Sequence, residues 1–177
     1  MQPSAEKILS VLVDLYAKQM GYSSMSNRKT NGENYTGGHK MKLSARNQFA
    51  GTVANVEAGA VNGIVTIDVK GTPITATISM NAIKELGLEA GKAAVAVIKA
   101  TEVMVATGGI TLSARNKFAG KVAAVEKGAV NDIVKIDTAV GTISATISDA
   151  AVKELGLEAD KDAVAVVKAT SVMVGVE

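Results

Sequence analysis

A chain of 177 residues is long enough for one ordinary domain or two small ones. Hydrophobic residues make up 47% of it but aromatic residues only 3%, so Val, Ile, Leu and Ala must fill the core, and small cores of this kind favour association. The absence of cysteine excludes disulfides and thiolate metal sites, and a net charge of +2 is too small to argue for a nucleic-acid surface. No apolar run approaches the length of a membrane span.

The N-terminal part of the chain differs in character from the rest. Ile8, Leu12 and Leu15 fall on one stripe, which predicts an amphipathic helix over residues 1–21. Residues 22–42 are rich in Ser, Asn, Gly and Lys, as flexible linkers are. No small-residue cleavage site follows the apolar run of this segment, so we expect no signal peptide.

An internal repeat occupies the remainder of the chain. Residues 43–105 align with residues 112–174 at a constant offset of 69, and 44 of the 63 aligned positions are identical. Segments this similar are expected to share one fold. We therefore predict two domains, over residues 43–107 and 108–177, held side by side by a short connection.

Each copy has a mostly β pattern. In the first copy, residues 49–56 and 64–69 alternate apolar and polar side chains as half-buried strands do, and residues 74–78 predict a third strand. Residues 94–99 and 101–105 are expected to supply the last strands of the same copy.

One short helix is expected between the third and fourth strands. Ser79 is placed to cap a helix over Met80–Leu86, which Gly87 would end, and Ser148 and Gly156 repeat the arrangement. The fold predicted is therefore mainly β: two tandem OB-like five-stranded barrels, each with one short helix, preceded by an N-terminal helix and a linker.

Catalytic and cation-binding constellations are missing from the sequence. The single histidine, His39, lies in the linker and is interpreted as solvated, and no His/Asp/Glu cluster has the spacing of a metal site. No Ser–His pairing, P-loop or GxGxxG is present. We therefore expect no enzyme activity and no cationic metal.

Small polar and cationic residues recur at both ends of each copy. Ser44-Ala45-Arg46-Asn47 returns as Ser113-Ala114-Arg115-Asn116, and Lys99-Ala100-Thr101 returns as Lys168-Ala169-Thr170. These cations interrupt apolar β segments, where they could simply discourage edge-to-edge aggregation. Alternatively they form a site for a tetrahedral dianion, which needs N–H and O–H donors, one or two positive charges and no carboxylate nearby.

A second repeated cluster follows the first strand of each copy, and a tight turn explains it without any function. Its small residues also leave backbone N–H groups open to a closely approaching anion. The cluster consists of Gly59, Ala60 and Val61 and their copies Gly128, Ala129 and Val130.

The blocks SARNxFxGxV, GAVN, ISxxAxKELGL and VxKAT occur in this order in both copies. This pattern resembles the Mop domain (molbindin, TOBE-like), a molybdate-binding module, over residues 41 to about 175. The resemblance implies an OB-like barrel, a trimer of two-repeat chains, cytoplasmic location, and anion sites between domains. The residues that it assigns to the main sites are Ser44, Ala45, Arg46, Asn47, Lys99, Ala100, Ser113, Ala114, Arg115, Asn116, Lys168 and Ala169; the glycine-alanine-valine clusters are candidates for additional sites near the three-fold axis.

The function implied is binding and storage of molybdate or tungstate, with no nucleic-acid or membrane partner. Donor chemistry alone would equally permit sulfate or phosphate. A transcriptional regulator would need a DNA-binding domain that the first 40 residues do not supply. An oligomeric adaptor or sensor module that docks a partner through the helix at residues 1–21 is the other alternative.

Overall fold

The computed structural model describes residues 43–109 and 111–176. The expected helix over residues 1–21, the linker over residues 22–42 and His39 lie outside the described residues. Within the described part, no helix is long and apolar enough to cross a membrane.

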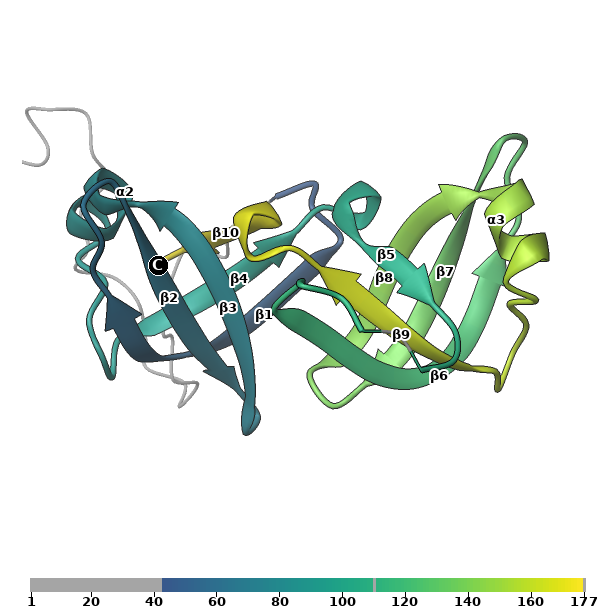
Figure 1. Cartoon of the computed structure of the whole chain (residues 1–177), viewed down its shortest axis with the longest axis horizontal. Coiled ribbons are helices and arrows are strands. Elements are labelled where there is room, and N and C mark those ends of the chain that lie inside the picture. The colour runs from purple at the N-terminus through teal and green to yellow at the C-terminus, as the bar shows by residue number, and fades with distance from the viewer. Residues whose placement is uncertain (1–42, 110, 177) are drawn as a thin grey trace, which may run out of the picture. The chain divides into compact units, whose positions relative to one another are not determined.

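The described residues form two copies of one arrangement (Figure 1). The first copy contains β1 (Asn47–Glu57), β2 (Asn62–Val69), β3 (Thr72–Ser79), α2 (Met80–Glu85), β4 (Ala93–Ile98), the 3₁₀ turn η1 (Ala100–Glu102) and β5 (Met104–Ala106). The second contains β6 (Asn116–Glu126), β7 (Asn131–Thr138), β8 (Gly141–Ser148), α3 (Asp149–Glu154), β9 (Asp162–Val167), the 3₁₀ turn η2 (Ala169–Ser171) and β10 (Val172–Gly175).

The strands build two curled, antiparallel five-stranded sheets, ordered β10-β4-β1-β2-β3 and β5-β9-β6-β7-β8. The two end strands of each sheet, β3 with β10 and β8 with β5, come into contact without pairing. Each sheet is therefore a partly closed barrel. This confirms the expected mainly β class with two OB-like five-stranded units and one short helix in each.

The fifth strand of each sheet comes from the other copy. Met104–Ala106 pairs with β9, and Val172–Gly175 pairs with β4, as Figure 1 shows for β5 and β10. The expectation that residues 101–105 would close their own barrel was wrong: Ala100–Glu102 forms η1, and the strand after it enters the second sheet. β4 and β9 are nearly identical in sequence, so either could pair with either closing strand. The repeat boundaries in the sequence are thus not the boundaries of the sheets.

Alternation along the strands places small aliphatic side chains in the core, as the composition predicted. In β3 the buried residues Ile74 and Ala76 alternate with partly exposed threonines. Phe49 and Phe118 are the only buried aromatic residues in the described part. The buried residues of both copies belong to one cluster, so the exchanged strands give the two barrels a continuous core.

The predicted helix stop and start signals are confirmed. The Ser79 hydroxyl accepts a hydrogen bond from the backbone N–H of Ala82 at 3.1 Å, and the Ser148 hydroxyl does the same for Ala151 at 3.2 Å. Gly87 adopts a φ of +56°, the left-handed conformation that ends a helix without steric cost. α2 is one residue shorter than expected, since Leu86 is its C-cap.

The two copies differ in chemistry at one corner beside the helix. A Cβ on Gly63 would lie 2.4 Å from Ile83 Cδ1, so a larger residue there would require the Ile83 side chain to move. The corresponding position in the second copy holds Asp132, opposite the smaller Val152. Asp132 is fully buried and accepts hydrogen bonds from Lys127 Nζ at 2.7 Å and from the Gly128 N–H at 3.0 Å.

Candidate functional site

Two equivalent pockets bring the repeated polar segments together. We name them by their arginines. The lining residues of the Arg115 pocket are Thr77, Met104, Leu112, Ser113, Ala114, Arg115, Lys168, Ala169 and Thr170, and those of the Arg46 pocket are Leu43, Ser44, Ala45, Arg46, Lys99, Ala100, Thr101, Thr146 and Met173. Their volumes, about 390 and 370 Å³, are nearly equal, as the repeat requires.

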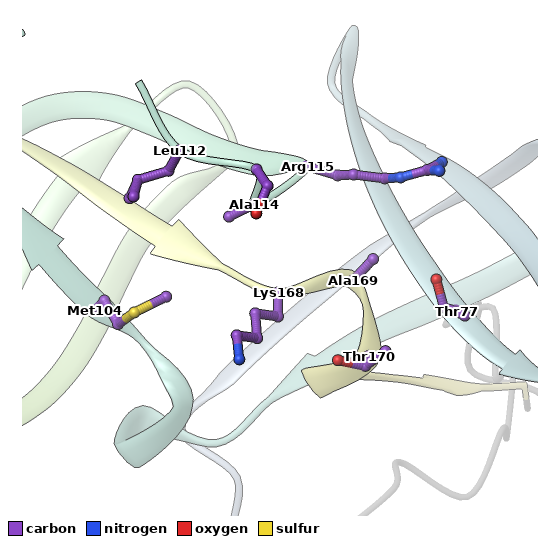
Figure 2. Close-up of a pocket in the computed structure, with 9 residues that line it drawn as sticks. Thr77, Met104, Leu112, Ala114, Arg115, Lys168, Ala169 and Thr170 are labelled. Atoms are coloured by element: carbon purple, nitrogen blue, oxygen red, sulfur yellow. The ribbon is translucent and has the colours of Figure 1, made fainter. Parts of the chain in front are cut away.

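Each pocket unites two segments that are more than fifty residues apart in the sequence. The segment before β6 carries Ser113 and Arg115. Figure 2 shows Arg115 on this segment and Lys168 on the bend between β9 and η2. Neither segment belongs to a β-strand, so its backbone N–H and C=O groups do not take part in the hydrogen bonds of a sheet. The structure thereby places ten of the twelve predicted main-site residues in two clusters of five.

The charges of the pockets suit an anion. The Arg115 pocket holds Arg115 and Lys168, the Arg46 pocket holds Arg46 and Lys99, and none of the residues that line either pocket is acidic. Within the described residues, none of these four cations forms an ion pair. All four side chains are exposed, so a bound anion would not have to displace an existing partner.

One carboxylate acts electrostatically on Arg46 from outside the pocket. The Glu126 carboxylate accepts a hydrogen bond from the Lys135 ammonium, and this contact, with a smaller contribution from Arg46, holds the pKa of the Glu126 carboxyl below its ordinary value. Glu126 is paired with Lys135, and Arg46 forms no ion pair with it in the described residues.

The two predicted asparagines lie elsewhere. Asn47 and Asn116 are buried and are absent from the linings of both pockets. Asn116 Nδ2 donates to the Thr75 carbonyl at 2.8 Å while its Oδ1 accepts from the Thr75 N–H at 2.7 Å. Asn47 makes the same pair of bonds to the backbone of Ser144, at 2.9 and 2.7 Å. Each amide therefore joins one copy to the edge strand of the other.

The glycine-alanine-valine clusters form tight turns before β2 and β7. A Cβ on Gly59 or Gly128 would lie 2.3 or 2.2 Å from the carbonyl oxygen of the asparagine three residues later, so glycine is required for the close approach. Val61 and Val130 are exposed. In the second copy the Gly128 N–H is already bonded to Asp132, so that turn offers fewer donors to an anion.

Sequence reasoning missed the contributions that cross between copies. Thr77 and Met104 of the first copy line the Arg115 pocket, and Thr146 and Met173 of the second line the Arg46 pocket. Met104 and Met173 arrive on the exchanged strands. The spacing of residues within one copy, which both copies share, does not indicate that residues of the other copy line the pocket.

Among residues 43–109 and 111–176, no group of three His, Asp or Glu side chains is arranged to hold a metal ion. In the same part of the chain every buried side-chain nitrogen and oxygen has a hydrogen-bond partner.

The chain matches a known family model twice. The model, described as the TOBE domain, matches residues 43–105 and 112–174. These two ranges are the same as those of the internal repeat.

Curated relatives share both repeats. The molybdenum transport protein ModE of Herbaspirillum seropedicae is 40% identical over 141 residues, which cover 77% of this chain and 52% of the relative. The molybdenum-pterin-binding protein MopA of Rhodobacter capsulatus is 37% identical over 137 residues, 75% of this chain and 52% of that protein. The chain thus spans about half the length of these relatives. Each is named for binding or transport and not for catalysis.

A solved structure resembles the described part of the chain. The cytoplasmic molybdate-binding protein ModG, crystallised with molybdate bound, superposes with a TM-score of 0.74 at 42% sequence identity. The match covers 77% of this chain and 100% of that one.

Proposed function

Because the chain belongs to the TOBE-domain family and carries two copies of that domain, we propose that it binds molybdate or tungstate and serves in storage and homeostasis of the oxyanion. The observation that carries the proposal is the pair of equivalent pockets, each with an arginine, a lysine, a serine hydroxyl and no acidic lining residue. The names of ModE, MopA and ModG, all referring to molybdenum or molybdate, support the identity of the ligand.

The chemistry of the pockets supports a fully ionised tetrahedral dianion. Arginine and lysine supply charge and N–H donors, and Ser44 and Ser113 supply hydroxyl donors. Ala45 and Ala114 leave room for the backbone N–H groups beside them to reach an anion. No carboxylate lines either pocket to accept the proton of hydrogen phosphate, which disfavours that ion. The protein acts by binding and is not an enzyme.

We place the main sites at junctions between domains. Each pocket is lined by both copies, which supports this placement. Each is also larger than a tetrahedral oxyanion and open to solvent, so a neighbouring subunit has room to cover the ligand. The proposed assembly is a trimer in the cytoplasm, and light scattering that gives the mass of a monomer at micromolar concentration would contradict it.

The turns at Gly59, Ala60 and Val61 and at Gly128, Ala129 and Val130 stay candidates for additional sites in that trimer. Asp132 places a carboxylate beside Gly128, so the turn of the first copy is the better of the two. The adaptor alternative depends on residues 1–21, which lie outside the described residues.

Calorimetric titration of the full chain with molybdate, tungstate, sulfate and phosphate tests the function. We expect molybdate and tungstate to bind about equally and both more tightly than the other two ions. A charge-assisted hydrogen bond contributes about 1.5–3 kcal/mol, so Arg46→Ala or Arg115→Ala should weaken binding at the altered pocket by about tenfold to a hundredfold.

The matched control removes a cation from outside the pockets. Lys84→Ala on α2 lowers the net charge by the same amount and should leave the affinity unchanged. Wild-type affinity in both arginine variants, or sulfate bound as tightly as molybdate, would remove the arginines from the site. Mass spectrometric metal analysis of the purified protein would name the anion independently.

A further inference from the structure

A threonine from the opposite copy lines each pocket beside the arginine and the lysine. Thr77 lies on β3 of the first copy but lines the pocket of Arg115 and Lys168. Thr146, on β8 of the second copy, lines the pocket of Arg46 and Lys99. Figure 2 shows the Arg115 side chain extending toward the strand that carries Thr77.

The asparagine bonds between the copies set the position of each threonine. Successive side chains of a strand point to opposite faces, so Thr75 and Thr77 share the face of β3 that points away from the buried Ile74 and Ala76. Asn116 holds both backbone polar groups of Thr75. Because Arg115 directly precedes Asn116, the same contact brings Arg115 and Thr77 to one pocket.

The second copy repeats this arrangement. Asn47 holds the backbone of Ser144, Arg46 precedes Asn47, and Thr146 lies two residues beyond Ser144. The same four-residue relationship therefore occurs in both copies of the repeat.

The hydroxyls of the two threonines have no structural use in the described residues. Neither makes a hydrogen bond there, whereas Thr138 and Thr142 donate theirs at 2.7 and 2.6 Å. Both side chains are partly exposed. A threonine is stiff at χ1, so its hydroxyl is held in few orientations before a ligand arrives. Valine would fill the same space on a strand equally well, so the hydroxyl is the group that distinguishes threonine at this position.

We propose that Thr77 and Thr146 each donate a hydroxyl hydrogen bond to the oxyanion bound in the pocket of the opposite copy. The proposal rests on the function proposed above and names the donor that makes each site a site of both copies. An anion held by Arg115, Lys168 and Thr77 spans the junction of the copies, so binding also stabilises their association.

The test replaces the hydroxyl with a methyl group of the same shape. Calorimetric titration of full-length Thr77→Val and Thr146→Val with sodium molybdate should show one class of sites weakened by about tenfold or more, as expected for loss of a hydrogen bond to a charged group. The pocket of the other copy should keep its wild-type affinity. Thr77→Ser keeps the hydroxyl and should bind within a few-fold of the wild type.

Thr66→Val is the matched control, because Thr66 is also partly exposed on a strand but lines neither pocket. It should bind as the wild type does. If Arg115→Ala weakens molybdate binding while Thr77→Val and Thr146→Val do not, the threonine assignment is wrong and the proposed function stands. If the wild-type chain takes up neither molybdate nor tungstate, the proposed function itself fails.

Discussion

The Ser171 hydroxyl donates a hydrogen bond to Glu102 Oε2 at 2.8 Å, although the two residues are 69 positions apart. That separation equals the offset of the repeat, so Ser171 and Glu102 occupy the same position in the two copies. The contacts between the copies are also reciprocal, because Asn47 bonds to Ser144 while its counterpart Asn116 bonds to Thr75. This exchange indicates a local two-fold relation between the copies, with η1 and η2 meeting where its axis passes. At this point the two copies carry different residues, and the difference has a physical reason: two glutamates there would repel each other.

Placing a glutamate at both equivalent positions, 102 and 171, should destabilise the protein. Ser171→Glu would remove the hydrogen bond and place two carboxylates in contact, at a cost on the order of 1 kcal/mol in a solvated position. Urea unfolding at neutral pH and low salt measures the loss, which should shrink as salt is added. The double variant Glu102→Gln with Ser171→Glu should recover most of it. Equal stability of the wild type and Ser171→Glu would show that the contact does not contribute to the free energy of unfolding.

The buried asparagines should matter for stability more than any residue of the pockets. Asn47→Ala or Asn116→Ala would leave a backbone N–H and a carbonyl of the opposite copy without partners, at roughly 1–3 kcal/mol for each group. Urea unfolding should show a loss of this size in each variant. Asn55→Ala, which removes an exposed amide bonded only to Glu57, should change stability by a few tenths of a kcal/mol. A loss no larger than that of Asn55→Ala would contradict the structural role.

Asp132 should make the second copy sensitive to acid. Hydrogen bonds from Lys127 and from the Gly128 N–H lower the pKa of this carboxyl from its ordinary value of 3.8. A group whose pKa is lower in the folded state contributes stability that is complete above the unfolded-state pKa and disappears as the pH falls through the folded-state value. The wild type should therefore lose the stability contributed by Asp132 as the pH falls below 3.8.

Asp132→Asn should be less stable than the wild type at neutral pH and should lose less on acidification. Thermal unfolding from pH 7 down to pH 3 measures both effects. Asp68→Asn, at an exposed carboxylate with no ion pair in the described residues, is the control and should follow the wild-type curve. Parallel curves for the wild type and Asp132→Asn would show that Asp132 does not titrate with a lowered pKa.

Removal of residues 1–40 should leave anion binding and assembly intact. Residues 43–109 and 111–176 supply both sheets and both pockets, and the match to ModG spans all of that protein. Titration with molybdate and light scattering on the truncated chain test this prediction. Loss of affinity or of the oligomer would mean that the first 40 residues belong to the functional unit.

The local signals in the sequence determined the elements and the donor chemistry. Alternation of Val and Ile with polar residues predicted the strands, and Ser79 with Gly87 predicted the helix, because strand faces and helix caps depend on residues a few positions apart. The repeat of Ser44, Arg46 and Lys99 predicted clusters of donors, since a carboxylate-free group of cations needs a chemical reason. None of these inferences required knowledge of how the strands and side chains of one copy contact the other copy.

Only the tertiary structure decided the pairing of the copies. β4 and β9 are so similar that the sequence does not show whether each pairs with the closing strand of its own copy or with that of the other copy. For the same reason it could not place Asn47 in a bond to Ser144 or Thr77 in the pocket of Arg115. A repeat predicts two copies of the same fold. Because equivalent strands of the two copies present nearly the same surface, each could pair within its own copy or with the other. Long-range packing determines which pairing forms, and local sequence patterns do not specify it.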